Sequence, residues 1–271
     1  SDGPRYAEIS LGEHVNMDAQ IDHWRYSIAS LRSAIRSGTV RELAEKASLS
    51  SPRSVERLRR HDKLTRIDKG GSTLTAVDTS GRKLRYNSPV SRQDPLVNDW
   101  RKRVSSLHTP PSHQEKLLIL LPCSATKPYR LSQSHHRFLR NIPSNRAHQI
   151  MVTSPLGLVP RELEDLWPAA HYDIPVTGDW DADELEMVKS MISEVCERVG
   201  YSEIINHSGM DIAIEGIVCN NTRRGTAGSK ESLNELKKSV MNSIEGMDLA
   251  DKSEKQHRIE VMKSRSRFIH G

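Results

Sequence analysis

The sequence predicts an α/β protein whose core domain has a parallel sheet with helices on both faces, preceded by a mainly helical segment and a small β-hairpin. Three observations support this fold class. From residue 116 onward, apolar runs of strand length alternate with segments of helical period. The first run, KLLILLP at 116–122, is continuously apolar, which is typical of a strand covered on both faces. Before residue 67, apolar residues instead recur at steps of three and four, as along an amphipathic helix.

Residues 1–66 form the first predicted segment, and we expect it to be helical. In DAQIDHWRYSIASLRSAIR, residues 18–36, the apolar side chains share one helical face, and Gly38 follows as a C-terminal glycine would. A further helix is predicted for SPRSVERLRRH, with Ser51 as its N-cap and Pro52 at its first position. Together with the hairpin that follows, these helices are also compatible with a winged helix-turn-helix, which reads DNA.

Residues 67–115 are predicted to be a hairpin and a linker. STLTAVD and RKLRYN flank a TSG turn and have the composition of two short strands. The polar, proline-containing remainder is typical of a linker around one short helix near Leu96–Ser106.

Residues 116–245 are predicted to be the α/β core domain, in which alternating strands and helices favour right-handed crossovers and a parallel sheet. The expected strands are 116–122, 148–153, 170–174 and 203–208, and the expected helices are 133–141, 181–200 and 229–240, with a helix or turn at 160–166. Residues 246–271 are a charged C-terminal extension to which the pattern assigns no structure.

Composition indicates a protein of the reducing intracellular compartment. The 271 residues include three widely spaced cysteines, Cys123, Cys196 and Cys219, which argues for free thiols rather than a disulfide framework. No apolar run is long enough to cross a membrane, and no signal-peptide pattern is present, so we predict a cytoplasmic protein without membrane contact. Because the chain begins with serine, we expect it to be a piece of a longer polypeptide.

Charge is distributed unevenly along the chain. Between Trp24 and Arg66, eleven Lys and Arg residues stand against four Asp and Glu residues, which is the balance expected of a phosphate-contacting surface. Between Glu162 and Arg198, eleven acidic residues stand against two basic ones. A nucleic-acid surface beside a site for a cation would explain this pattern, and so would two solvated faces of opposite sign.

Polar segments follow each predicted strand, where ligands bind in parallel α/β sheets. They are PCSATKPYRLSQSH, TSPLGLVPRELE, AAHYDIPVTGDWD and INHSGM. Cys123 lies one residue beyond the first strand, and we expect Lys127, His135 and backbone N–H groups to lower the pKa of its thiol. Such a thiolate can add to a nitrile or acyl carbon. The alternative is a small buried residue that fills space below the loop.

The remaining candidates are residues that bind polar ligands or transfer protons. Hydroxyls, a cation, turn glycines and a histidine make up the predicted ligand-binding set: Ser124, Lys127, Tyr129, Ser132, Ser134, Ser154, Gly157, Thr177, Gly178 and His207. The serines can equally be N-caps and turn formers. His135, His171 and Asp173 are candidates for acid-base chemistry, and no HxxxH spacing favours a metal. Phosphate-loop and dinucleotide motifs do not occur, so we expect no cofactor in this piece of the chain.

Three motifs in this order, PCSATKPYRLSQSH, TSPLGLVPREL and WPAAHYDIPVTGDW, resemble the core domain of the archaeosine synthase α-subunit family, relatives of archaeal tRNA-guanine transglycosylase. The resemblance covers about 116–240 and includes NNTRRGTAGSKESL near its end. HWRYSIASLRSAIRSGTVRELAEKA is similar to the terminal helices of the transglycosylase-like domain, so 1–66 are expected to be its helical tail. This similarity displaces the winged-helix interpretation. His23 stands where the relatives bind zinc, but no cysteine precedes Cys123, and a PUA domain is not evident.

The resemblance implies an enzyme that joins the ε-amine of free lysine to the nitrile of 7-cyano-7-deazaguanine in the D-arm of tRNA. A radical S-adenosylmethionine lyase partner then cleaves the adduct to archaeosine. On this interpretation Asp173 anchors the lysine ammonium, and His171 or His135 carries the proton. Tyr129, His135 or backbone N–H groups stabilise charge on the nitrile nitrogen. Cys123 either forms a transient thioimide or lines the pocket. The alternative function is a non-catalytic tRNA-binding scaffold of the transglycosylase family.

Overall fold

The computed structural model describes residues 16–75, 83–174 and 179–270. Contacts within the chain divide it into two compact units, Ser1–Ser80 and Gly81–Gly271. They are called the N-terminal unit and the C-terminal unit below.

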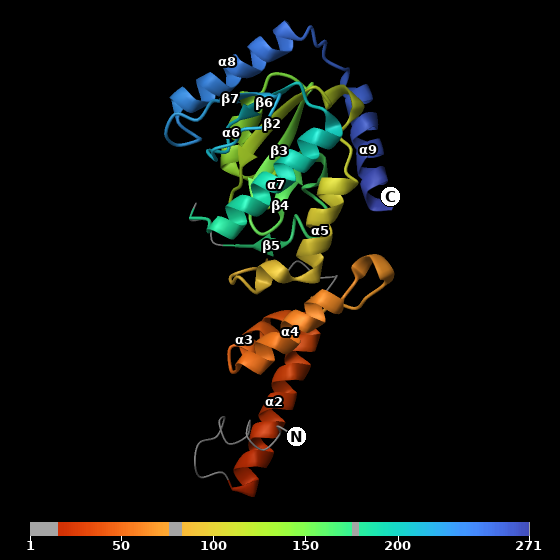
Figure 1. Ribbon diagram of the computed structural model, residues 1–271, viewed down its shortest axis with the longest axis vertical. Helices are drawn as coiled ribbons and strands as arrows, with labels where there is room; N and C mark the ends of the chain where they lie inside the picture. Colours follow the sequence, from red (N-terminus) through yellow and green to blue (C-terminus); the bar gives the residue numbers. More distant parts are fainter. Residues whose placement is uncertain (1–15, 76–82, 175–178, 271) are drawn as a thin grey trace. The chain divides into compact units, whose positions relative to one another are not determined.

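Helices make up the described part of the N-terminal unit (Figure 1): α2 Met17–Ser37, α3 Val40–Ser48 and α4 Pro52–Leu64, followed by the short 3-10 helix η1 Ile67–Lys69. The sequence predicted their ends well. Gly38 is left-handed at the end of α2 with φ 67°, and the Ser51 side chain accepts a hydrogen bond from the Ser54 backbone N–H at the start of α4. Inside the unit, the buried Arg41 guanidinium pairs with Asp62 and Glu45 and joins α3 to α4.

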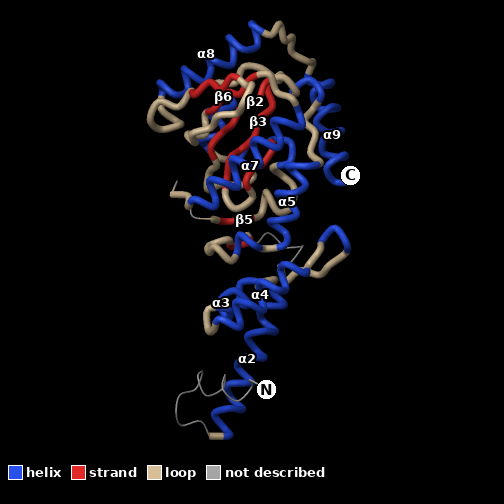
Figure 2. The backbone as a smooth tube through the Cα atoms, viewed as in Figure 1, coloured by secondary structure: helices blue, strands red, loops and turns tan. Residues whose placement is uncertain are grey.

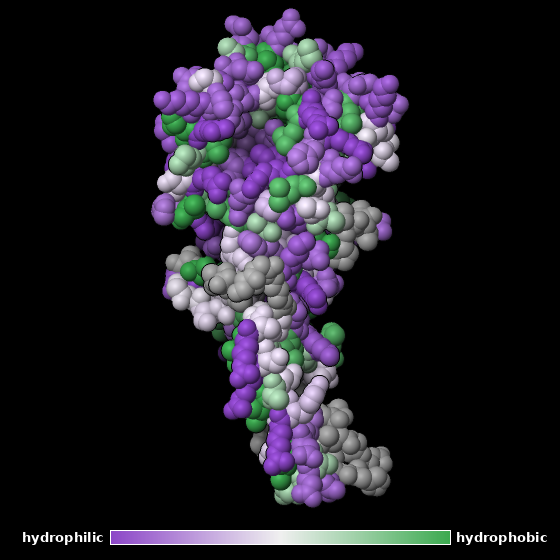
Figure 3. Space-filling model, turned by 180° about the vertical axis from the view of Figure 1, so that it is seen from behind, coloured by the Kyte–Doolittle hydropathy of each residue, from purple (hydrophilic) through white to green (hydrophobic). Residues whose placement is uncertain are grey.

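The apolar stripe of α2 is exposed. Trp24, Ile28, Leu31 and Ile35 each retain at least 45% of their accessible surface. Hydrophilic side chains lie between such apolar ones on the surface of this unit (Figure 3). The predicted amphipathic helix is therefore present, but its apolar face is not buried.

The predicted hairpin is only partly testable, because residues 76–82 lie outside the described residues. Residues 72–75 contain no strand. The second predicted arm contains β1 Leu84–Arg85, which pairs in parallel with β5 Tyr172–Asp173 and therefore belongs to the C-terminal unit. Its partner is thus a strand far along the chain.

A mostly parallel sheet forms the centre of the C-terminal unit, as the sequence predicts (Figure 2). Its strand order is β4-β3-β2-β6-β7, with bounds β2 Leu117–Pro122, β3 Ala147–Thr153, β4 Gly157–Pro160, β6 Glu203–Asn206 and β7 Val218–Asn221. Three of the four pairings are parallel, and β4 runs antiparallel to β3. The sequence missed β4 and β7, and it wrongly placed the strand at 170–174 in this sheet.

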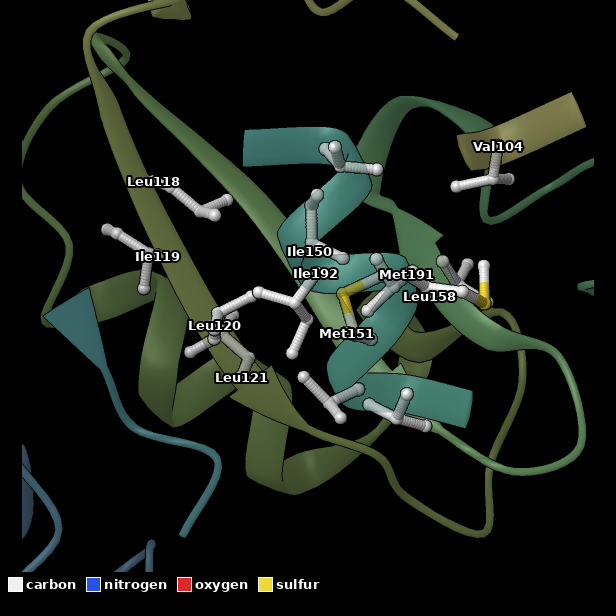
Figure 4. Close-up of a cluster of buried hydrophobic side chains, with 14 of the residues drawn as sticks. Val104, Leu118, Ile119, Leu120, Leu121, Ile150, Met151, Leu158, Met191 and Ile192 are labelled. Carbon is white, nitrogen blue, oxygen red and sulfur yellow. The ribbon is translucent and has the colours of Figure 1, made fainter. Parts of the chain in front are cut away.

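Helices pack around this sheet: α5 Pro95–Ser106, α6 Gln133–Arg140, α7 Ala182–Val199, α8 Lys230–Gly246 and α9 Glu254–His270, with the short turns η2 Ser91–Gln93, η3 Ser112–Gln114, η4 Tyr129–Leu131 and η5 Arg161–Leu163. The start of α7 is a capping box, in which Asp181 and Glu184 each accept from the other's backbone N–H. The apolar face of α7 packs on β2, β3 and β4 (Figure 4), where the labelled side chains are Leu118, Ile119, Leu120, Leu121, Ile150, Met151, Leu158, Met191, Ile192 and Val104.

Two segments that looked peripheral contribute to this core. Val97, Trp100 and Val104 of α5 are buried in it, although the sequence placed them in a linker. Phe268 of α9, in the predicted extension, packs its ring edge-on against Trp100 at 5.4 Å between centroids. None of the helices in the described part of the chain is both long and apolar enough to cross a membrane.

Candidate functional site

Cys123 and Thr153 lie side by side at the carboxyl edge of the sheet. Pro122 ends β2 and is in register with Val152, so Cys123, the first residue after β2, lies next to Thr153, the last residue of β3. The Thr153 side chain is close enough to the Cys123 thiol to lower its pKa. This is the edge at which parallel α/β sheets bind ligands.

A chain of hydroxyl groups continues from Thr153 into the interior. Thr153 Oγ1 lies 2.7 Å from Tyr172 Oη, which lies 2.5 Å from Tyr129 Oη. Both tyrosines are fully buried, and burial raises the pKa of each phenol well above its usual range. The phenols are therefore neutral donors at physiological pH. The sequence singled out Tyr129, but Tyr172 was missed because it reads as an ordinary strand residue.

Lys127 completes this cluster. Its side chain is buried, with Nζ 4.3 Å from the centroid of the Tyr172 ring. Nζ has no hydrogen-bond partner among the residues that the structure describes. Burial lowers the pKa of Lys127, while Cys123 and Asp173 partly oppose that shift. The ammonium of Lys127 lies over the Tyr172 ring and interacts electrostatically with Cys123 and Asp173.

The thiol of Cys123 does not have the lowered pKa that the sequence suggested. Burial raises the pKa, and Lys127 and Thr153 oppose this only in part. The ring of His135 hydrogen-bonds to Pro122 and Arg161 instead. Cys123 as a residue is nevertheless only half-buried.

His135 is held on both sides by hydrogen bonds. Its Nε2 lies 3.0 Å from the Pro122 carbonyl oxygen, and its Nδ1 lies 2.9 Å from Arg161 Nη2. Burial, together with the Arg161 charge, lowers the pKa of His135 to about 3. The neutral ring therefore donates from Nε2 to the carbonyl and accepts at Nδ1. This arrangement fixes the start of the loop that carries Cys123.

The serines of the loop act largely in the local structure. Ser132 is the N-cap of α6, where its hydroxyl accepts from the His135 backbone N–H, and it lies 3.2 Å from Ser134 Oγ. Ser124 Oγ donates to the Thr126 carbonyl. The cap-and-turn interpretation therefore describes their observed contacts.

The other predicted residues lie around this cluster at various distances. Asp173 is exposed beside Tyr172, and the ring of the half-buried His171 lies 5.6 Å from that of Trp167. Ser154 donates to the Glu184 carboxylate, and Gly157, with φ 75°, sits against α7. Thr177 and Gly178 lie outside the described residues.

His207 is not part of the thiol cluster. It is fully buried, and its Nδ1 and Nε2 lie 2.8 Å and 2.9 Å from Thr222 Oγ1 and the Ala227 carbonyl oxygen. Phe138 stands between its ring and that of His135, with 5.2 Å between centroids on either side. Cys123, Lys127, Thr153, Tyr129 and Tyr172 thus form the thiol–amine cluster, and Asp173 is the carboxylate nearest to it in sequence.

A second polar cluster was missed entirely. His108, His148 and Glu162 are buried together, with Glu162 Oε1 lying 2.8 Å from His108 Nε2 and 3.2 Å from His148 Nε2. Burial alone would raise the pKa of Glu162, but the two imidazoles hold it well below its usual range. Burial also lowers the pKa of His108. Spacings of 40 and 14 residues carry no local signal.

Comparisons with known proteins agree with the resemblance read from the motifs. The chain is 34% identical over 194 residues to archaeosine synthase subunit alpha of Methanosarcina acetivorans, covering 61% of this chain and 30% of that protein. It is 30% identical over 255 residues to archaeosine synthase of Methanocaldococcus jannaschii, covering 90% and 41%. A 90-residue stretch is 51% identical to archaeosine synthase of Haloferax volcanii, covering 33% and 15%.

The chain therefore spans less than half the length of these relatives. Residues 97–240, more than half of the chain, match the family model described as a domain of unknown function, DUF5591. These residues run from α5 to α8 and contain both the thiol–amine cluster and the buried histidine cluster. The chain belongs to the DUF5591 family.

Proposed function

We propose that the C-terminal unit is the core of a tRNA-modifying transferase of archaeosine biosynthesis, which joins lysine to the nitrile of 7-cyano-7-deazaguanine in the D-arm of tRNA. The observation that carries this proposal is the thiol–amine cluster. A thiol, an amine of lowered pKa without a hydrogen-bond partner among the described residues, and a chain of neutral hydroxyls lie together at the carboxyl edge of the sheet. The names of the similar archaeosine synthases supply the substrate class.

Cys123 acts as the nucleophile in the first step. Its sulfur adds to the nitrile carbon, one C–N π bond breaks, and the thiol proton passes by way of the Lys127 side chain to the nitrile nitrogen. The product is a thioimidate. The lowered pKa of Lys127 makes the neutral amine accessible, as a general base requires.

The ε-amine of free lysine attacks the same carbon in the second step. The C–S bond breaks, a proton from the amine returns to sulfur, and an amidine linkage remains. No electrons are gained or lost overall. Neutral Tyr172 is placed to donate toward negative charge near Thr153, a contribution of about 3 kcal/mol in comparable sites.

Asp173 is the proposed anchor for the α-ammonium of lysine. Asp173 is exposed on the same short strand as Tyr172, and the charge of its carboxylate raises the pKa of Lys127. Both nitrogens of His135 already have partners, so His171 is the better candidate for an additional proton carrier. Ser124 and Ser134 are proposed to contact the substrate only through their hydroxyls. We further propose that the reaction is cytoplasmic, needs no organic cofactor, and passes its product to a radical S-adenosylmethionine lyase.

The test is transfer of radiolabelled lysine to tRNA that carries 7-cyano-7-deazaguanine. Acid-precipitable label should appear with the unaltered chain and fall at least ~100-fold in Cys123→Ser, since a hydroxyl is a far poorer nucleophile at this pH. Cys219→Ser, at the other half-buried cysteine, is the matched control and should retain transfer. Asp173→Asn should raise the lysine concentration needed for half-maximal transfer.

Full transfer by Cys123→Ser would remove the covalent step. Salt-sensitive tRNA binding with no lysine incorporation by the unaltered chain would favour the alternative, a tRNA-binding scaffold.

A further inference from the structure

We propose that His108, His148 and Glu162 bind a divalent transition-metal ion such as Zn²⁺. This histidine–glutamate site is separate from the thiol–amine cluster and does not depend on the proposed reaction. It joins three places in the C-terminal unit: the loop after α5, strand β3 and the turn η5.

The three side chains have the spacing that a metal needs. One nitrogen from each histidine and one carboxylate oxygen of Glu162 all lie within 4.8 Å of one another. The two distances from Glu162 Oε1 are 2.8 Å and 3.2 Å. Ligands that lie 2.0–2.1 Å from a tetrahedral zinc are separated by about 3.3 Å, so small side-chain shifts bring all three atoms to one ion.

Hydrogen bonds alone leave this cluster incompletely satisfied. His148 Nε2 is fully buried and directed at the carboxylate, but it makes no hydrogen bond among the described residues, and neither does His108 Nδ1. Buried polar atoms without partners are uncommon and call for an explanation. A cation between the two Nε2 atoms and the carboxylate satisfies His148 Nε2.

The buried carboxylate of Glu162 also favours a bound cation. The Glu162 carboxylate is buried between two imidazoles. The nearby guanidinium groups bind elsewhere: Arg161 contacts Gln149, Glu164 and His135, and Arg198 donates to the Ser105 and Val104 carbonyls. A buried anion is costly unless it is paired or coordinates a metal.

Groups around the site are suited to orient metal ligands. Tyr201 Oη lies 2.5 Å from His148 Nδ1, so this nitrogen can donate while Nε2 faces the ion. Such a contact on the far nitrogen is the usual support of a metal-bound histidine. Ser264 Oγ of α9 lies 3.4 Å from Glu162 Oε1 and closes the site from another side.

The ligand set and burial define the kind of ion. Two imidazoles and one carboxylate suit zinc and its first-row neighbours, whereas Mg²⁺ and Ca²⁺ prefer oxygen ligands throughout. The three protein ligands leave one tetrahedral position for a fourth ligand, and their burial encloses the ion in the protein interior. The proposal departs from the expectation that no metal is bound.

Metal analysis of the purified chain provides the first test. After chelation and reloading with Co²⁺, about one ion per chain should be retained through gel filtration, and visible ligand-field bands should appear. Removing the ion should lower the midpoint of thermal unfolding. Less than ~0.1 ion per chain after reloading with Zn²⁺ or Co²⁺, with the same midpoint before and after chelation, would overturn the proposal.

Variants assign the ion to these residues. His148→Gln and Glu162→Gln should each weaken Co²⁺ binding at least ~10-fold, as expected when a direct ligand is lost. His113→Gln is the matched control, because His113 is also a buried histidine of the C-terminal unit but pairs with His257. Equal Co²⁺ retention in all three variants would place the ion elsewhere and contradict the assignment. If a ligand variant does not fold, the metal content and spectrum of the unaltered chain still decide whether an ion is bound.

Discussion

Lys127 is a buried charged residue that lowers the stability of the fold and takes part in the proposed reaction. Its ammonium is buried over an aromatic ring without a hydrogen-bond partner among the described residues. Such a group is retained at a cost, since replacing a buried charge by an apolar side chain of similar volume is often neutral or stabilising. Because Lys127 interacts electrostatically with Cys123, the proposed transfer of the thiol proton explains why a charged residue is kept here.

Lys127→Met should separate stability from reactivity. We expect the free energy of unfolding to be unchanged or up to ~1 kcal/mol higher in urea titrations, because methionine keeps the packing and removes the desolvated charge. Lysine transfer should fall at least ~100-fold with loss of the base.

Alkylation of Cys123 by iodoacetamide should also slow in Lys127→Met. Lys127 lowers the thiol pKa, so removing it raises that pKa further and reduces the thiolate fraction. Cys219 in the same chain is the internal control and should react at an unchanged rate. Faster alkylation of Cys123 would show that Lys127 does not act on the thiol through its charge.

His135 makes stability depend on pH. The pKa of His135 is about 3 in the folded chain, against ~6.5 for an unfolded histidine, so the unfolded state binds the proton first as pH falls. The contribution of this residue is complete above about pH 6.5 and is lost as pH falls toward 3. Between pH 7 and 5 the loss is about 2 kcal/mol.

His135→Gln removes this proton-binding difference and keeps a side-chain N–H. The free energy of unfolding of the unaltered chain should therefore decrease more between pH 7 and 5 than that of the variant, by about 2 kcal/mol in urea titrations. Identical decreases in the two proteins would mean that His135 takes up a proton when folded.

At the level of secondary-structure elements, the absence of a side chain at Gly157 allows strand β4 to pack closely against helix α7. The φ of 75° at Gly157 is left-handed, and a Cβ there would overlap Met191 Sδ and lie 3.0 Å from Met187 Sδ. Gly157→Ala should lower the free energy of unfolding by at least ~1–2 kcal/mol, from the left-handed backbone alone. Gly246→Ala, where a Cβ meets open space, is the control and should change stability by less than ~0.5 kcal/mol.

Helix α9 is part of the core through Phe268. Its ring packs on Trp100 and His108, and Arg103 lies over it at 4.5 Å from the centroid. Phe268→Ala should cost about 3 kcal/mol or more of unfolding free energy because it leaves a cavity. Ile269→Ala, one position along and 48% exposed, should cost less than ~1 kcal/mol, and equal losses would mean that α9 does not dock as described.

At the scale of the whole molecule, the two units divide the proposed work. Exposed Arg53, Arg57 and Arg60 lie at steps of four and three residues on one face of α4, in the N-terminal unit. The C-terminal unit contains the thiol–amine cluster. We expect the N-terminal unit to bind tRNA and the C-terminal unit to carry out the proposed reaction.

Replacing Arg53, Arg57 and Arg60 by Ala should weaken tRNA binding and reduce the slope of log affinity against log salt by up to about three, near one for each lost phosphate contact. Filter binding over a range of salt concentrations measures the slope. Alanine at Lys237 and Lys238, exposed on α8, is the control. An unchanged slope in the arginine variant would place the tRNA contacts elsewhere.

Local pattern predicted much of this protein, because helix period, caps and apolar strand runs act over a few residues. This local pattern predicted strand β2, helices α6 and α7, and the start of α4 at Ser51. It also selected Cys123, Lys127 and Tyr129 as candidates, because they follow a strand. The directions of the pKa shifts of Cys123 and Lys127 could not be predicted in the same way. They depend on how deeply these two side chains are buried, and that burial is set by residues from other strands.

What the sequence determined by itself is the order of strands β2, β3 and β6 and of helices α6, α7 and α8, the mostly parallel sheet and the family motifs. Tertiary structure alone decided that β1 pairs with β5, that Tyr172 reaches Thr153, and that His108, His148 and Glu162 meet in the interior. The physical reason is that these partners are separated by 14 to 88 residues, from 148 to 162 and from 84 to 172. Packing of the complete unit, rather than any local preference, brings them into contact.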